Sequence, residues 1–188
     1  LVGSEMCIRD RYYHSFDGSY GGLWRRNGRP PQLLAGVGFS AQGKFEGSYY
    51  RRTAESRAPD LAWMFEGIED QEILGDFGFS GGGAAGFELD RADVRLGTPE
   101  EVRVVASSEN HTSSFVLVPE EMLTHITNWP GEEEQQKLIR SDIVYFRTPS
   151  GGEVFSTGSI TFCGSLPWND FDNNISRLLE NVIRRFLQ

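Results

Sequence analysis

Two acidic residues, Glu88 and Asp90, follow a glycine-rich segment and are the side chains in this sequence best suited to chemistry. Residues 75–86 are dense in glycine, which lets a backbone adopt positive φ and approach another group closely. The alternation of Phe87 and Leu89 with the two acids predicts a strand with both carboxylates on one face, roughly 7 Å apart at ~3.3 Å rise per residue. One substrate group could then contact both acids in a proton transfer. The alternative is a surface turn and a half-buried strand with solvated acids.

Other reactive motifs are incomplete. Residues 81–86 satisfy the spacing G-x-G-x-x-G, but a strand-like run follows them instead of the helix that a dinucleotide site requires. Cys163 and the serines Ser159 and Ser165 lack the strand-turn-helix elbow of hydrolase nucleophiles. A buried thiol is the favoured interpretation of Cys163.

Histidine and tyrosine raise the question of a metal or acid–base site. His111 follows the β-prone run 102–108, where a parallel α/β fold would place site residues; the alternative is a hydrogen-bonded loop histidine. A second group of metal-binding residue types near the N-terminus has no framing helix or strand, so packing of its aromatic rings is favoured. Its members are Tyr12, Tyr13, His14 and Asp17.

Apolar patterning predicts the elements that would position these groups. Residues 33–39 and 102–108 predict buried strands, and the runs 143–147 and 153–157 predict a hairpin around turn residues 149–152. Helices are expected at 59–67, at 119–123, from Glu132 and, most clearly, at 175–187. The last has an apolar stripe with helical spacing, preceded by Asx residues that can cap its first turn. The stripe consists of Ile175, Leu178, Leu179, Val182, Ile183 and Phe186.

The amino-acid composition limits the classes of protein to which this chain can belong. A chain of 188 residues with 38% hydrophobic and 24% charged residues is most simply one domain. The net charge of -9 disfavours a nucleic-acid backbone as partner. We expect a cytoplasmic protein, because we find no secretory signal and no apolar run of membrane-spanning length. Two cysteines, Cys7 and Cys163, are too few for a disulfide framework.

The N-terminus suggests a fragment. The chain begins with Leu1, and residues 1–11 look like translated adapter sequence, so we exclude them from fold reasoning. Native sequence is then expected to begin near Tyr12, and residues 12–188 form the domain.

Several segments in combination resemble one family. They are 13–18, 36–43, 78–91 and the region from 155–159 through 172–174. Together they are similar to the C-terminal region of the large subunit of N,N-dimethylformamidase, over essentially residues 12–188.

The resemblance implies an iron-dependent amide hydrolase that releases formate and an amine. It also implies an α/β fold with a mostly parallel sheet and flanking helices, similar to class I glutamine amidotransferases and flavodoxin-like folds and incomplete at the N-terminus. A mononuclear iron would be held by two tyrosines and a glutamate upstream of this chain. Glu88 matches an expected carboxylate near the iron, whereas Asp90 is left as structural. A small subunit and an oligomer of large subunits are the implied partners.

Two functions of different class remain open. One is the C-terminal part of an iron amidohydrolase, inactive as a fragment and holding no iron by itself. The other is a non-catalytic binding or assembly domain of the same amidotransferase-like fold. The sequence does not determine which amide is the substrate.

Overall fold

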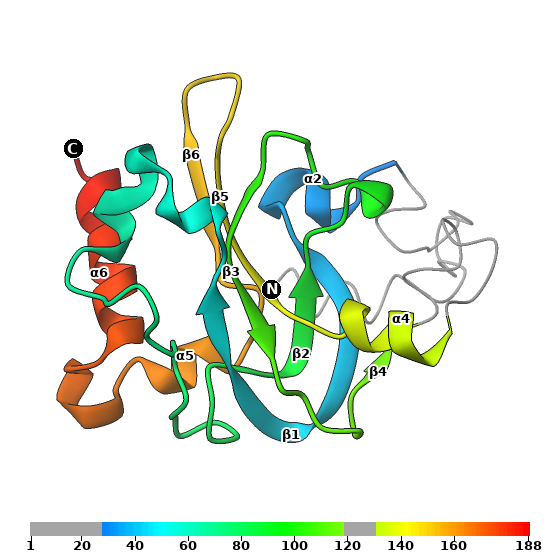
Figure 1. The fold of residues 1–188 in the computed structure, drawn as a ribbon. Helices are drawn as coiled ribbons and strands as arrows, with labels where there is room; N and C mark the ends of the chain where they lie inside the picture. Colours follow the sequence, from blue (N-terminus) through cyan, green and yellow to red (C-terminus); the bar gives the residue numbers. More distant parts are fainter. Residues whose placement is uncertain (1–27, 119–130) are drawn as a thin grey trace, which may run out of the picture.

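A strongly curled antiparallel sheet forms the centre of the molecule (Figure 1). The computed structural model describes residues 28–118 and 131–188. Within these residues the sheet has the strand order β2-β1-β3-β5-β6, and β4 pairs with β1. The strands are β1 (Gly38–Arg52), β2 (Ala85–Arg91), β3 (Arg103–Glu109), β4 (Val116–Leu117), β5 (Asp142–Arg147) and β6 (Glu153–Ser156).

The long strand β1 causes the curl. Its 15 residues pair with β2 and β4 in the first part and with β3 from Tyr49 onward. Its pairing with β2 shifts register between Phe39 and Ala41 and again between Gln42 and Gly47. Such bulges bend a strand and increase its twist. The sheet therefore rolls until the segment after β6 meets the free edge of β2, where Leu89 and Ser159 form a bridge.

The expected parallel α/β fold is wrong, because every strand pair in the described sheet is antiparallel. Parallel pairs need long crossovers, usually helical, whereas a tight turn joins β5 to β6. The apolar run in β5 resembles a parallel strand because both of its faces are covered. Ile143 and Tyr145 pack in the cluster that contains Leu178, while Val144 packs with Val37 in another.

Short helices surround the sheet. They are α2 (Pro31–Ala35), η2 (Glu55–Arg57), η3 (Pro59–Phe65), η4 (Val94–Leu96), α4 (Glu132–Leu138), α5 (Phe162–Ser165), η5 (Trp168–Phe171) and α6 (Asn174–Phe186). The strand expected at 33–39 is wrong, since α2 occupies its first part and ends at Gly36 in a left-handed conformation. The helix expected at 119–123 lies outside the described residues, as do residues 1–11.

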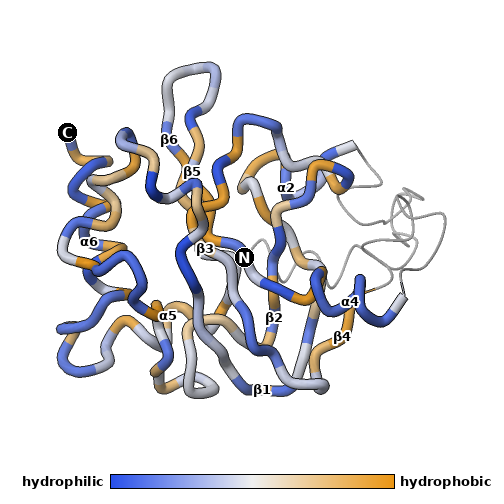
Figure 2. Tube along the Cα trace, in the orientation of Figure 1, coloured by the Kyte–Doolittle hydropathy of each residue, from blue (hydrophilic) through white to orange (hydrophobic). Residues whose placement is uncertain are grey.

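The C-terminal helix α6 is confirmed, but only part of its predicted apolar stripe is buried, since Ile183 is 49% and Phe186 45% exposed. Ile175, Leu178 and Val182 are buried, and the Asn173 side chain accepts a hydrogen bond of 2.9 Å from the Ser176 N–H. Figure 2 shows hydrophilic and hydrophobic positions alternating along this helix. The expected strand at 102–108 and the hairpin are confirmed as β3 and as β5 with β6. In the described part of the chain, none of the helices has the length and hydropathy to cross a membrane.

Candidate functional site

The glycine-rich segment packs directly against the backbone of β1. The Gly47 N–H donates to the Gly81 carbonyl at 2.7 Å. A Cβ at Gly83 would lie 2.3 Å from the Ser48 carbonyl oxygen, and one at Gly86 would lie 2.2 Å from that of Glu46. These glycines are therefore required for the close approach of two protein segments, and β2 follows them where a dinucleotide site would need a helix.

Two rows of side chains cross β2, β1 and β4. In the buried row, Leu89 lies opposite Ala41, which lies opposite Leu117, and all three belong to one core cluster. One position further along, Glu88 lies opposite Gln42, which lies opposite Val116. We call this second set, together with Ile160, the exposed row. Ser159 forms an antiparallel bridge to Leu89. The next residue, Ile160, therefore lies beside Glu88.

Glu88 is half-buried in the exposed row. Within residues 28–118 and 131–188, its carboxylate has no hydrogen bond or ion pair. The neighbouring Phe87 has a left-handed backbone (φ 60°) and meets Phe45 edge to face, with ring centroids 5.8 Å apart. Phe87 therefore does not join Leu89 in the core cluster, so the expected alternation holds only from Glu88 onward. The assignment of Glu88 as the catalytic residue stays a prediction.

Asp90 has a different environment from Glu88. Its backbone N–H donates to the Gly158 carbonyl at 2.8 Å. Burial raises the pKa of the nearby Tyr50, and the negative charge of Asp90 adds to that shift. A register shift in β1 separates the partner of Asp90, Phe39, from the partner of Glu88. The two acids that could share one substrate group thus have different neighbours.

His111 ends a chain of buried hydrogen bonds. Its Nε2 lies 2.7 Å from the Ser108 hydroxyl, which accepts a hydrogen bond of 2.7 Å from the Ser141 N–H. The Ser141 hydroxyl contacts the Tyr50 hydroxyl at 2.9 Å, and Tyr50 donates to the Thr157 carbonyl at 2.8 Å. The described strand that precedes this histidine, β3, pairs antiparallel with both of its neighbours, so the reason for expecting a site there is wrong.

The imidazole of His111 is held in its neutral form. Burial lowers its pKa to about 4, against an opposing effect of the nearby Glu46 carboxylate. The ring packs on Phe115 with centroids 4.7 Å apart, and its Nδ1 is buried without a partner among the described residues. The geometry favours the hydrogen-bonded loop histidine. No hydrogen bond joins it to Glu88 in this part of the chain.

The hydroxyl groups of the candidate serine nucleophiles are hydrogen-bonded to the backbone, and the candidate thiol is exposed. The Ser159 hydroxyl accepts from the Gly86 N–H and donates to its carbonyl, both at 2.9 Å. The Ser165 hydroxyl donates to the Phe77 carbonyl at 2.6 Å. Cys163 is exposed, which corrects the expectation of a buried thiol, because it lies on the outer side of the short helix α5.

Two buried charges were not anticipated. Asp142 is fully buried and accepts hydrogen bonds from the Ser107 hydroxyl (2.6 Å), the Arg140 Nε (3.0 Å) and the Ala92 N–H (3.0 Å). The buried Arg91 donates to the Leu138 carbonyl at 2.7 Å and to Asp93 at 2.9 Å. Nothing in the local sequence distinguishes these residues from surface charges, because their burial depends on strands distant in the chain.

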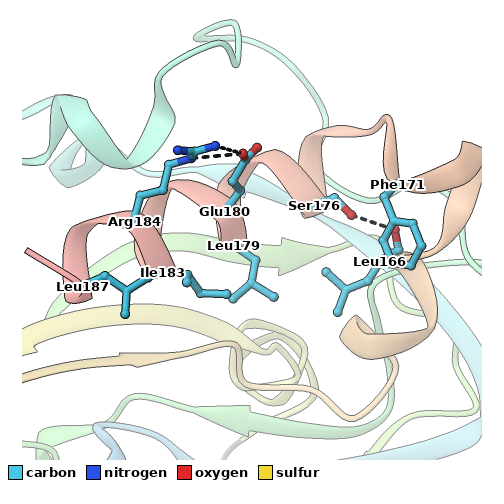
Figure 3. A pocket seen from close by; sticks show the side chains of 8 residues that line it. All are labelled: Leu166, Phe171, Ser176, Leu179, Glu180, Ile183, Arg184 and Leu187. Atoms are coloured by element: carbon cyan, nitrogen blue, oxygen red, sulfur yellow. Dashed lines mark hydrogen bonds and ion pairs between the residues drawn. The ribbon is translucent and has the colours of Figure 1, made fainter.

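An apolar groove of about 540 Å³ runs along α6 (Figure 3). Its charged residues pair with each other, since Glu180 contacts Arg184 at 2.6 Å and Arg177 at 3.1 Å. Its hydroxyl group, on Ser176, donates to the Leu166 carbonyl at 2.7 Å. The groove therefore lacks an uncommitted group for acid–base chemistry. It is lined by Leu166, Phe171, Ser176, Leu179, Glu180, Ile183, Arg184 and Leu187.

Metal-binding side chains do not converge in the described residues. No group of three or more His, Cys, Asp or Glu residues there could hold a metal ion. The N-terminal cluster of Tyr12, Tyr13, His14 and Asp17 lies outside the described part of the chain. The iron ligands that the resemblance implies, two tyrosines and a glutamate, are expected upstream of this chain, and the iron site stays a prediction.

Comparison with known proteins identifies the family. The model of the family described as "N,N-dimethylformamidase beta subunit-like, C-terminal" matches residues 4–174. The chain is 39% identical over 177 residues to the N,N-dimethylformamidase beta subunits of an Alcaligenes species and of Paracoccus aminophilus. The matches cover 94% of this chain and 23% of each relative. The chain therefore belongs to the family of N,N-dimethylformamidase beta subunit-like C-terminal regions.

Proposed function

We propose that this chain is the C-terminal part of an amide hydrolase that converts a small N-substituted formamide into formate and an amine. The observation that carries the proposal is the match to two N,N-dimethylformamidase beta subunits over 94% of the chain. Because the chain spans 23% of the length of these relatives, the activity is proposed for the full-length subunit.

In this proposal Glu88 is the proton acceptor. A carboxylate can remove a proton from the water that attacks the amide carbonyl carbon, and can return that proton to the amine nitrogen as the C–N bond breaks. The support for Glu88 is its half-buried carboxylate with no partner among the described residues. A base that is already held by several donors, such as Asp142, is poorly suited to accept another proton.

The iron implied by the resemblance is a separate part of the proposal. Its expected ligands, two tyrosines and a glutamate, would come from sequence upstream of this chain. The described residues include no group of three His, Cys, Asp or Glu side chains that could hold it. We expect the 188-residue chain alone neither to retain stoichiometric iron nor to hydrolyse dimethylformamide, which metal analysis and an amine-release assay would check.

A second candidate is a non-catalytic assembly domain. The apolar groove on α6 and the side chains of the exposed row favour it, because exposed apolar patches mark interaction sites. The relatives are named as beta subunits, so a second kind of subunit is the proposed partner, together with an oligomer of large subunits. A cytoplasmic location is part of the same proposal.

Glu88→Gln in the full-length subunit, assembled with its partners, separates the two candidates. The substitution keeps size and polarity but removes the base, so kcat for dimethylformamide should fall by roughly 10²–10⁴. Iron content and melting temperature should stay nearly unchanged. Asp90→Asn on the same strand is the control and should have a much milder effect. Equally small effects of both changes would favour the assembly domain.

A further inference from the structure

We infer that the exposed row around Glu88 is a docking surface for the remainder of the same subunit, the part that the relatives carry outside the region matched here. This inference deepens the proposed function and rests on it. The face that this part of the subunit would cover is formed by the neighbouring strands β2, β1 and β4.

Exposed apolar side chains lie in the row that contains Glu88 and against its chain neighbour Phe87. Val116 is 59% exposed, Ile160 60% and Phe45 63%. Val116 and Ile160 lie at opposite ends of the exposed row, and Phe45 stands on Phe87, next to Glu88. Apolar residues gathered around one position, and not scattered singly, are typical of a surface that another protein segment covers.

The Glu88 carboxylate limits which chemical groups the covering segment can place opposite it. Burying a charged group without a compensating partner is costly, and the described residues offer this carboxylate no partner. The occupant must therefore bring a cation or hydrogen-bond donors to a position opposite Glu88.

The size of the relatives supports an occupant within the same polypeptide. This chain corresponds to 23% of each relative, so most of the subunit lies outside it. Interfaces between domains of one chain typically bury about 600–1,500 Å². The groove on α6 is a weaker candidate for this contact, because Glu180 and its two arginines already satisfy each other there.

Thiol labelling of the full-length subunit tests the inference without measuring activity. Val116→Cys and Ile160→Cys are made separately in a Cys163→Ser background, because Cys163 is exposed. Maleimide labelling is followed by peptide mass spectrometry. Val94→Cys is the matched control, since Val94 is 60% exposed on η4, outside this face. We expect positions 116 and 160 to react at least tenfold more slowly than position 94. Comparable rates at the three positions would overturn the inference.

The labelling rates test the docking surface, and the turnover of Glu88→Gln tests the catalytic role, so either hypothesis can be refuted without the other. Protection at positions 116 and 160 with unchanged turnover in Glu88→Gln would support the docking surface and refute the catalytic role. Fast labelling at both positions with a large loss of turnover would refute the docking surface and support the catalytic role.

Discussion

Two carboxylates of the same sheet, Asp142 at the start of β5 and Glu88 in β2, show opposite uses of an acidic side chain. Asp142 is fully buried and accepts hydrogen bonds from a hydroxyl, a guanidinium and a backbone N–H. Glu88 is half-buried among apolar neighbours and has no such partner in the described residues.

The difference separates structural from chemical roles. A buried carboxylate with its donors in place holds strands together, and removing it leaves those donors unpaired. A carboxylate without partners contributes little to the fold and remains available to accept a proton or to pair with a group from elsewhere. Substitutions in the 188-residue chain can test this distinction, because its stability can be measured apart from activity.

The largest effect is expected for Asp142→Ala. Removing one member of a buried ionic group typically costs about 3–5 kcal/mol, because the buried Ala92 N–H and the Ser107 hydroxyl would lose their acceptor and the half-buried Arg140 its ion pair. Glu88→Ala should change the free energy of unfolding by less than about 0.5 kcal/mol. Urea unfolding of both variants measures the difference. A similar loss in both would mean that Glu88 is also a structural residue.

The buried row and the exposed row across β2, β1 and β4 allow the same comparison between apolar residues. Leu89→Ala in the buried row should cost about 2–5 kcal/mol, as expected for a fully buried leucine. Val116→Ala and Ile160→Ala in the exposed row should each stay within about 0.5 kcal/mol. Thermal or urea unfolding tests this ranking. Large losses at positions 116 or 160 would show that the exposed row is covered within this chain.

His111 is intermediate between these two cases, because one ring nitrogen is hydrogen-bonded and the other has no partner among the described residues. Its pKa is lowered to about 4 in the folded chain, so the unfolded chain takes up the proton first as the pH falls. Stability due to neutral His111 should be complete above about pH 6.5 and should decrease toward pH 4, by at most about 3 kcal/mol. His111→Gln should flatten this part of the curve. An identical pH dependence in both proteins would contradict the buried neutral imidazole.

A smaller loss than at Asp142 or Leu89 is expected in the glycine segment that precedes Glu88. Gly86→Ala would place a methyl group 2.2 Å from the Glu46 carbonyl oxygen, and overpacking of this kind typically costs about 1–3 kcal/mol. Gly131→Ala has open space around its Cβ position and should cost well under about 1 kcal/mol. Equal melting temperatures of the two variants would show that the loop can move away from β1 without loss.

Local patterns in the sequence determined the family and several elements. The combination of segments from 36–43 to 172–174 was sufficient for the resemblance that the comparisons confirm. Helical periodicity predicted α6, and turn residues between two β-prone runs predicted the hairpin of β5 and β6. These features depend on residues close together in the chain, where propensity, capping and turn chemistry act.

Only the tertiary structure decided the direction of the strands and the state of each acid. The antiparallel roll follows from bulges in β1 and from the bridge between Leu89 and Ser159, which no local pattern encodes. The role of an acidic residue depends on donors that are distant in sequence: Asp142 accepts a hydrogen bond from the Ala92 N–H, 50 residues away. Glu88 and Asp142 both occur in β-prone runs, but pairing between distant strands buries Asp142 among donors, while the described residues place none at the Glu88 carboxylate.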